Sequence, residues 1–111
     1  MKINLSEKTI ENHILIYLKS RGIFAWKNQS VGVFDPVKKI YRKSKNPFHL
    51  NGTSDIIGIY KGKMLAIEVK SAKGVVSEDQ KEFINNINKL GGIAFIARSL
   101  EDVVERLSNL S

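Results

Sequence analysis

Two acidic residues and one lysine have a spacing that would bring them together on paired strands. Asp55 and Glu68 lie on either side of Lys61-Gly62, a dipeptide typical of a two-residue hairpin turn. Counting outward from such a turn along both strands places Asp55 opposite Glu68, on one face of the sheet, with Cβ atoms about 5 Å apart. Lys70 follows two residues after Glu68, so strand alternation places it on the same face about 6.6 Å farther along.

These three side chains suit the hydrolysis of a phosphodiester. Two opposed carboxylates repel each other unless a proton or a cation lies between them. Carboxylate oxygens suit Mg²⁺ or Mn²⁺, which also keep waters and substrate phosphates as ligands. Lys70 could orient or help deprotonate a metal-bound water, and could neutralise charge that develops on the phosphorane. The pattern predicts Asp55 and Glu68 as metal ligands and Lys70 as the catalytic lysine.

A purely structural interpretation of these residues is also possible, because Glu-x-Lys triplets are common by chance. In that interpretation Asp55 belongs to a turn, and Glu68 and Lys70 form an ordinary exposed pair on a strand. Residues 65–69, however, are a nearly continuous apolar run that predicts a buried strand, where an unpaired acid is costly. This context, together with the matched register, favours the catalytic interpretation.

Gln80 and Glu11 have two interpretations each. Gln80 follows Ser77 at the spacing of a capping box, but it also lies on the helical stripe that should face the sheet, from which its amide could reach the attacking water or a phosphate. Glu11, on the first predicted helix, could reach the same metal cluster or form a solvated pair with Lys8. The residues alone leave Gln80 open and favour the solvated pair for Glu11.

The elements that must position these residues alternate between helices and strands. Three helices are expected to begin at the N-caps Ser6, Ser77 and Ser99 and to end near Arg21, Leu90 and Leu107. The predicted strands are residues 23–29, 31–34, 56–60, 64–69 and 93–97. Asp35-Pro36 starts a turn, and the basic stretch from there to Asn46-Pro47 is interpreted as a hairpin arm or a mobile loop.

This order of elements predicts an α/β domain. Residues 64–97 are long enough for a right-handed crossover between two parallel strands. The functional crevice of such folds lies outside the carboxyl ends of the parallel strands. Glu68, Val69 and Lys70 occupy one of these ends.

Composition excludes several other classes of protein. A chain of 111 residues predicts a single domain, residues 1–111. The absence of cysteine excludes disulfides and thiolate zinc sites and favours a reducing, cytoplasmic setting, and two histidines are too few for a histidine metal cage. No apolar run approaches the roughly 20 residues that cross a bilayer, so no membrane association is expected. No phosphate-binding loop or dinucleotide fingerprint is present, so no nucleotide cofactor is expected.

Positive charge is concentrated in one quarter of the chain. The sequence has 18 basic and 11 acidic residues, a formal net charge of +7. The excess lies between Lys19 and Lys45, where a phosphate backbone would be attracted, although a basic run can also be a merely solvated face. The candidate nucleic-acid contacts are Lys27, Lys38, Lys39, Arg42, Lys43 and Lys45, with Lys73 farther along.

Aromatic residues are interleaved with these bases and could stack on nucleobases or sugars. They are Phe24, Trp26, Phe34, Tyr41 and Phe48. For most of them we expect half-buried positions on strands instead.

Four segments resemble the VRR-NUC branch of the PD-(D/E)xK nuclease superfamily. They are Gly52-Thr53-Ser54-Asp55, Ala66-Ile67-Glu68-Val69-Lys70, Ser77-Glu78-Asp79-Gln80 and Gly91-Gly92-Ile93-Ala94-Phe95. Residues 11–22 also resemble the first helix of that branch and the start of archaeal Holliday junction resolvases. The superfamily often has proline where this chain has Ser54, but serine fits the VRR-NUC branch. The resemblance covers nearly the whole chain and is weakest from Val33 to Leu50.

The resemblance implies a restriction-endonuclease-like core, with a mixed β-sheet flanked by helices in the order αβββαβα. It implies Mg²⁺ or Mn²⁺ held by Asp55, Glu68 and the Val69 carbonyl, with Lys70 as the catalytic lysine. It also implies a catalytic role for Gln80 and a role in metal binding for Glu11.

The expected function is a metal-dependent DNA endonuclease. Small stand-alone members of this branch, in phages and bacteria, resemble structure-specific endonucleases that act as homodimers on branched DNA, so branched or four-way-junction DNA and a homodimer are expected here. Two alternatives stay open. One is a noncatalytic nucleic-acid-binding module, and the other is a restriction-like or RNA-directed nuclease of the same fold.

Overall fold

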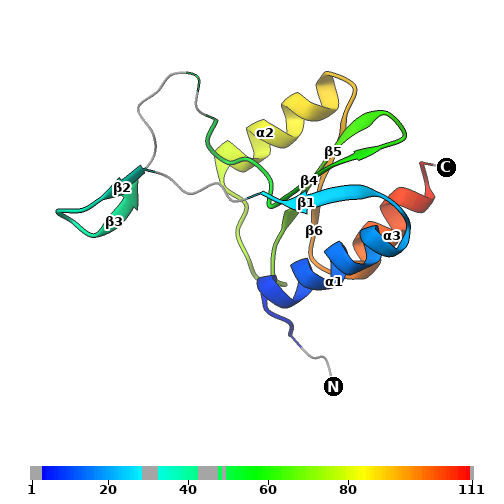
Figure 1. The fold of residues 1–111 in the computed structure, drawn as a ribbon, viewed down its shortest axis with the longest axis horizontal. Helices are drawn as coiled ribbons and strands as arrows, with labels where there is room; N and C mark the ends of the chain where they lie inside the picture. Colours follow the sequence, from blue (N-terminus) through cyan, green and yellow to red (C-terminus); the bar gives the residue numbers. More distant parts are fainter. Residues whose placement is uncertain (1–3, 29–32, 43–47, 49, 111) are drawn as a thin grey trace.

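A mixed four-stranded sheet lies at the centre of the molecule, with helices on both of its faces (Figure 1). The structure is a computed structural model that describes residues 4–28, 33–42, 48 and 50–110. The strands, in spatial order, are β1 (Phe24–Lys27), β4 (Ile56–Tyr60), β5 (Lys63–Val69) and β6 (Ile93–Ala97). The helices are α1 (Glu7–Ser20), α2 (Glu78–Lys89) and α3 (Leu100–Ser108). These elements follow one another in the predicted order αβββαβα.

The β4–β5 hairpin has the predicted register. Tyr60 pairs with Lys63, and the ladder continues to the pair Ile56 and Ile67. Lys61 and Gly62 have φ angles of 51° and 80°, and two successive positive φ values are typical of a type I′ turn. The turn dipeptide therefore sets the alignment of every residue along both strands.

The connection from β5 through α2 to β6 is a parallel crossover, as predicted. Leu65 pairs with Ile93 and Val69 pairs with Ala97 in the parallel ladder. The backbone N–H of Lys70 donates a hydrogen bond of 3.0 Å to the Ala97 carbonyl, one step beyond the last pair. The carboxyl ends of β5 and β6 therefore lie side by side.

The two faces of the sheet are covered unequally. α1 and α3 pack on one face, over the larger cluster of buried residues. This cluster contains Ile10, Ile14, Leu18, Ile56, Leu65, Ile67, Val69, Ile93, Phe95, Ala97, Val103 and Leu107. α2 packs on the other face over β5 and β6. The smaller cluster there consists of Ala66, Phe83 and Ala94, with Ile57, Ile84 and Ile87 packed against it.

All three helices begin at their predicted serine caps. Each serine side chain accepts a hydrogen bond from the backbone N–H three residues later: Ser6 from Thr9, Ser77 from Gln80, and Ser99 from Asp102. α1 ends at Ser20, and Gly22 reverses the chain with a φ of 71°. Within the described residues, no helix has the length and apolar character needed to cross a membrane.

The segment between β1 and β4 differs most from the prediction. Of the strand predicted over 23–29, β1 contains residues 24–27, and Ile23 and Asn28 are not in a strand. Of the strand predicted over 31–34, residues 33 and 34 lie in β2 (Val33–Asp35), and residues 29, 31 and 32 lie outside the described residues. β2 pairs antiparallel with β3 (Ile40–Arg42) in a two-stranded ribbon that stands apart from the main sheet in Figure 1. The hairpin interpretation of the basic stretch is thus confirmed for residues 33–42. Lys43, Lys45 and His49 lie outside the described residues.

Candidate active site

The predicted acidic pair lies at the end of the β4–β5 hairpin that is opposite to its turn. Asp55 directly precedes β4, and Glu68 is the residue of β5 that follows the pair Ile56 and Ile67. The backbone N–H of Val69 donates a hydrogen bond of 2.9 Å to Asp55 Oδ2, which holds this carboxylate against the end of β5. Glu68 is 2% exposed. The structure therefore brings the two carboxylates together, as the hairpin register requires.

The loop before Asp55 lies directly against the start of α2. Gly52 has a φ of +73°, and a Cβ at this position would lie 2.5 Å from the backbone carbon of Asp79 and 2.6 Å from the backbone nitrogen of Gln80. Both the backbone angle and the space require glycine. The loop that carries Asp55 and the helix that carries Gln80 are therefore in close contact.

Asn28, directly after β1, binds the same loop from its other side. Its side-chain amide donates hydrogen bonds of 3.1 Å to Thr53 Oγ1 and 3.1 Å to the Ser54 carbonyl. Its backbone N–H donates a hydrogen bond of 2.7 Å to the Asp55 carbonyl. Asn28 was not predicted, because its role depends on β1 lying beside β4, and no local pattern in the sequence indicates that pairing.

Gln80 makes the capping-box contact that was one of its two interpretations, and it makes a second contact, to Glu68, that was not predicted. Its Oε1 accepts a hydrogen bond of 2.9 Å from the Ser77 backbone N–H, which completes the capping box. Its Nε2 donates a hydrogen bond of 3.2 Å to Glu68 Oε1. The two ends of one amide thus fix the start of α2 and orient the buried carboxylate.

Glu68 has an unusual protonation equilibrium. Burial, a hydrogen bond to Asp55 and the charge of Asp55 together raise the pKa of Glu68 from 4.5 to about 9, against the ammonium of Lys70, which lowers it. Without a bound cation, Glu68 therefore keeps its proton at neutral pH. A divalent cation would replace that proton, since metal binding requires the deprotonated carboxylate.

The acidic pair fits a hard divalent cation. Glu68 Oε2 is buried and has no hydrogen-bond partner, so it is an acceptor that a cation would satisfy. Across residues 4–28, 33–42, 48 and 50–110, no three acidic or histidine side chains come together to hold an ion. A site with few protein carboxylates suits Mg²⁺ or Mn²⁺, which fill their remaining positions with backbone carbonyls, waters and phosphates.

Lys70 directly follows β5 and is half-buried beside the next loop. A Cβ at Gly74 would lie 3.3 Å from both Cβ and Cδ of Lys70, so the Gly74 backbone packs on the lysine stem. Arg98 holds this loop in place: its Nη1 donates hydrogen bonds of 2.7 Å to the Ser71 carbonyl and 2.9 Å to the Gly74 carbonyl, and it lies 3.3 Å from the Ala72 carbonyl.

Arg98 was not predicted either, although the sequence contained a usable signal. It directly follows β6, and the carboxyl ends of parallel strands share one edge of a sheet. The same rule that selected Glu68 and Lys70 therefore places Arg98 beside the loop that follows Lys70.

Glu11 is buried in α1 instead of forming the expected solvated pair. Lys27 Nζ, at the end of β1, lies 3.4 Å from Glu11 Oε1, and that oxygen has no hydrogen-bond partner. The solvated interpretation is wrong because β1 and the sheet cover this side of α1. The structure does not bring Glu11 into a cluster of three acids with Asp55 and Glu68.

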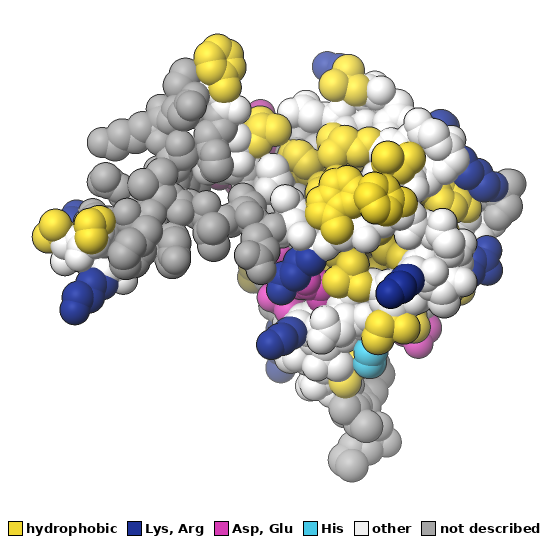
Figure 2. All heavy atoms as spheres, in the orientation of Figure 1, with side chains coloured by type: hydrophobic (Ala, Val, Ile, Leu, Met, Phe, Trp, Pro, Cys, Tyr) yellow, Lys and Arg dark blue, Asp and Glu magenta, His cyan; other side chains and the backbone are white. Residues whose placement is uncertain are grey.

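The candidate nucleic-acid contacts are divided between two parts of the molecule. Lys38 and Lys39 are exposed in the turn of the β2–β3 ribbon, where basic side chains are visible in Figure 2. Lys27 and Lys73 are exposed at the end of β1 and on the loop after β5. The Arg42 side chain is outside the description, as are Lys43 and Lys45.

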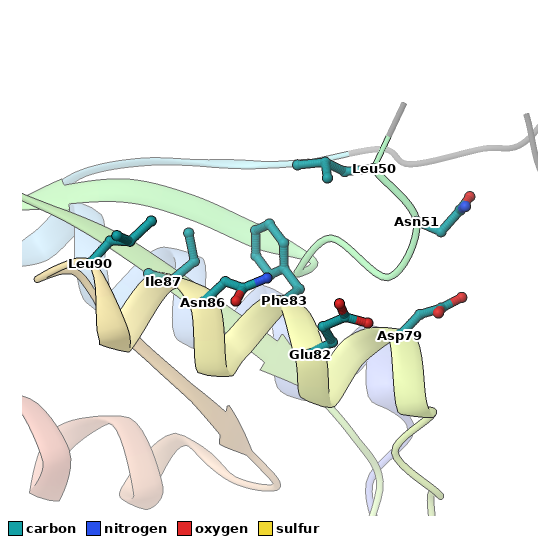
Figure 3. A pocket seen from close by; sticks show the side chains of 8 residues that line it. All are labelled: Leu50, Asn51, Asp79, Glu82, Phe83, Asn86, Ile87 and Leu90. Atoms are coloured by element: carbon teal, nitrogen blue, oxygen red, sulfur yellow. The ribbon is translucent and has the colours of Figure 1, made fainter. Parts of the chain in front are cut away.

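A separate hollow of about 340 Å³ lies along α2 (Figure 3). Its lining residues are Leu50, Asn51, Asp79, Glu82, Phe83, Asn86, Ile87 and Leu90. Asp79 and Glu82 make its rim acidic, which disfavours a phosphate backbone. This hollow does not contain the acidic pair, and we assign it no part in the chemistry.

Comparison with known proteins yields a family, a relative and a solved structure. Residues 36–101, more than half of the chain, match the model of the family described as the VRR-NUC domain. The Holliday junction resolvase RecU of Mycoplasmopsis pulmonis (strain UAB CTIP) is 32% identical over 95 aligned positions, which cover 69% of this chain and 60% of the resolvase. The chain therefore spans about three-fifths of the length of this relative.

A solved structure described as a VRR_NUC domain protein has a TM-score of 0.60 to this chain. The match covers 96% of this chain and 88% of the other, at 19% sequence identity, and a likeness at that identity concerns the fold alone. It confirms the prediction of a mixed sheet flanked by helices in a restriction-endonuclease-like arrangement.

Proposed function

The chain belongs to the VRR-NUC domain family of nucleases, and from this premise we propose that it is a metal-dependent DNA endonuclease. One observation supports the proposal above all others. A buried glutamate, Glu68, lies beside Asp55, receives a hydrogen bond from Gln80, and keeps its second oxygen without a partner. An acid in that position destabilises the fold unless a proton or a cation is bound. In a nuclease, a bound divalent cation would assist the hydrolysis of the phosphodiester.

In this proposal Asp55, Glu68 and the Val69 carbonyl hold Mg²⁺ or Mn²⁺. The ion, when bound, neutralises the scissile phosphate and lowers the pKa of the attacking water. Gln80 keeps Glu68 in its binding orientation, and the Val69 N–H does the same for Asp55. The Lys70 ammonium compensates the negative charge that develops on the phosphate oxygens. Glu11 lies on the other side of the sheet end, and its charge is balanced by Lys27.

The substrate we propose is branched DNA, in the first place a four-way junction. The support is the likeness to a Holliday junction resolvase, and the basic turn of the β2–β3 ribbon offers additional contacts to a backbone. Resolution of a four-way junction needs two cuts, so a homodimer follows if the junction is the substrate. Contacts to phosphates predict affinity that falls steeply with salt and depends little on base sequence.

Cleavage assays on labelled four-way junction, flap, nicked duplex, linear duplex, single strand and RNA test this proposal. We expect the wild type to cut the junction best in Mg²⁺ or Mn²⁺ and not in EDTA. Asp55→Asn and Glu68→Gln should each reduce the cleavage rate at least roughly 100-fold while DNA binding persists. Glu82→Gln, which removes one exposed acid from α2, is the matched control and should cut normally.

Two results would contradict the proposal. If the wild type cuts none of these substrates in either metal but binds them, the chain is a noncatalytic binding module. If RNA or unbranched duplex is cut faster than the junction, the enzyme is confirmed and its proposed substrate is wrong.

A further inference from the structure

Two aromatic side chains on β1 are exposed, contrary to the half-buried positions expected from the sequence. Phe24 is 70% exposed and Trp26 is 42% exposed. Their ring centroids are 5.3 Å apart, and the ring planes are inclined at 51°. Large aromatic side chains on an outer strand lose stability by remaining in water, so their exposure calls for a ligand.

Incomplete cover by α2 explains the exposure. In the β1–β4 ladder, Trp26 pairs with Ile57 and Phe24 pairs with Ile59. Ile57 packs against the cluster under α2, so the two aromatic residues share the sheet face on which α2 lies. That helix covers β5 and β6, whereas Ile59 and Met64 remain exposed beside Phe24. Figure 2 shows hydrophobic side chains gathered on the surface at this part of the sheet.

This aromatic pair is continuous with the candidate active site. Asp55 precedes Ile57 by two residues, so it lies on the same face about 6.6 Å along the strand direction from the position opposite Trp26. The Asn28 N–H, two residues after Trp26, donates to the Asp55 carbonyl. A nucleotide chain that reaches the acidic pair would therefore have Trp26 within about one nucleotide of its path.

We propose that Phe24 and Trp26 form a stacking platform for unpaired nucleobases of a DNA strand that enters the active site. Aromatic side chains beside a cationic path are the usual means of holding single-stranded DNA, because every base has a face that can stack. The platform rests on the proposed nuclease function and deepens it: bases that unpair at the branch point, next to the scissile phosphate, would stack on the two rings.

The main rival occupant of this face is a second copy of the chain, since exposed apolar patches also mark protein interfaces. Two observations favour DNA. Each copy carries a net charge of +7, which attracts a polyanion to its surface. The patch also runs along the sheet face directly toward the acidic pair, as an approach for substrate must.

Intrinsic fluorescence tests the platform directly, because Trp26 is the sole tryptophan of the chain. The wild type is titrated in EDTA, where cleavage is not expected, with a thymidine homopolymer and with a duplex of equal length. Stacking on Trp26 predicts saturable quenching by the single strand and much weaker quenching by the duplex. No quenching at saturating single strand would overturn the proposal.

Substitutions separate aromatic stacking from simple apolar contact. Trp26→Phe keeps a ring and should bind a labelled single strand nearly as the wild type does, whereas Trp26→Leu should weaken binding roughly ten-fold in fluorescence anisotropy. Phe24→Leu should have a smaller effect in the same direction. Ile16→Ala, which removes a side chain that is 68% exposed on α1, is the control and should not change binding. Circular dichroism melts of all variants verify their folding.

Light scattering tests whether a second copy of the chain occupies this face instead of DNA. If the wild type is a dimer that Trp26→Leu converts to monomer, while single-strand affinity is unchanged, the face binds a second copy and the platform proposal is wrong. Cleavage of duplex and junction DNA in Mg²⁺ is measured in parallel. Quenching without any cleavage would refute the nuclease function but leave the binding of unpaired bases by Phe24 and Trp26 in place. Cleavage without quenching would refute the platform and leave the nuclease function in place.

Discussion

The two faces of the central sheet differ in packing and in chemistry. Under α1 and α3 the sheet buries a large, almost wholly apolar cluster. Under α2 the buried cluster is small, a buried acid and its amide partner lie at one end, and exposed aromatic residues lie at the strand beside it. We infer that the α1 face supplies most of the stability of the fold. The α2 face can therefore hold a buried acid and exposed aromatic side chains, although both lower the stability of the folded protein.

The largest expected effect on stability lies on the α1 face. Ile14 of α1 is fully buried, so Ile14→Ala should lower the free energy of unfolding by about 2–5 kcal/mol. Ile84→Ala, on the half-buried flank of the α2 cluster, should cost clearly less. Urea denaturation of both variants measures the difference. Equal losses would mean that the two faces contribute equally and that the comparison is wrong.

A pH dependence of stability is expected from the α2 face. The pKa of Glu68 is about 9 in the folded protein and 4.5 ordinarily, so the folded protein holds a proton that the unfolded chain releases above pH 4.5. Without divalent metal, the free energy of unfolding should therefore fall as pH rises between these two values, by at most ~1.4 kcal/mol per pH unit.

Glu68→Gln provides the control for this titration, because an amide does not titrate and the slope should disappear. Unfolding of the wild type and the variant in EDTA, from about pH 5 to about pH 8, measures it. Mg²⁺ should stabilise the wild type more as pH rises, since binding expels the proton. A wild-type slope equal to that of the variant would show that Glu68 does not hold a proton.

A smaller effect is expected from Arg98, which acts on Lys70 only through the loop between them. Arg98→Lys has a shorter side chain, and its ammonium would not lie where Nη1 bonds the Ser71 and Gly74 carbonyls, so kcat should fall roughly ten-fold while KM for DNA changes little. Arg106→Lys is the matched control, because Arg106 lies over the Phe95 ring on the α3 side. A rise in KM with unchanged kcat would identify Arg98 as a DNA contact instead of a positioning residue.

The smallest effect is expected from single exposed lysines. Lys73→Gln should weaken DNA binding a few-fold for every sequence and reduce the magnitude of the salt slope of log affinity by about 1. Binding measured over a range of salt concentrations tests this. Lys89→Gln, at the far end of α2, is the control, and an equal change there would mean that only net charge matters.

Local patterns predicted much of this structure. The dipeptide Lys61-Gly62 determined the register that places Asp55 beside Glu68, and three serines marked the starts of the helices. These predictions succeeded because turns and caps are determined by residues a few positions apart. The helical stripe likewise placed Gln80 toward the sheet.

What could not be predicted depends on contacts between distant segments. The burial of Glu11 and the role of Asn28 both follow from β1 lying beside β4, and nothing near either residue encodes that neighbour. The exposure of Trp26 follows from where α2 ends its cover of the sheet. The contact of Gln80 with Glu68 could not be predicted, because it depends on how α2 lies against β5.

The pairing of β1 with β4 determines which part of the chain tolerates insertions and deletions. Lys27 and Ile56 are paired, so the chain leaves the sheet and returns to it at adjacent positions. The β2–β3 ribbon lies within that excursion, and the entropy of closing such an excursion depends only weakly on its length. The ribbon is therefore an exchangeable module: it can be shortened, lengthened or replaced without altering the register of the strands beneath it. Residues of the ribbon can therefore change in number and type while the acidic pair and its hydrogen bonds stay in place.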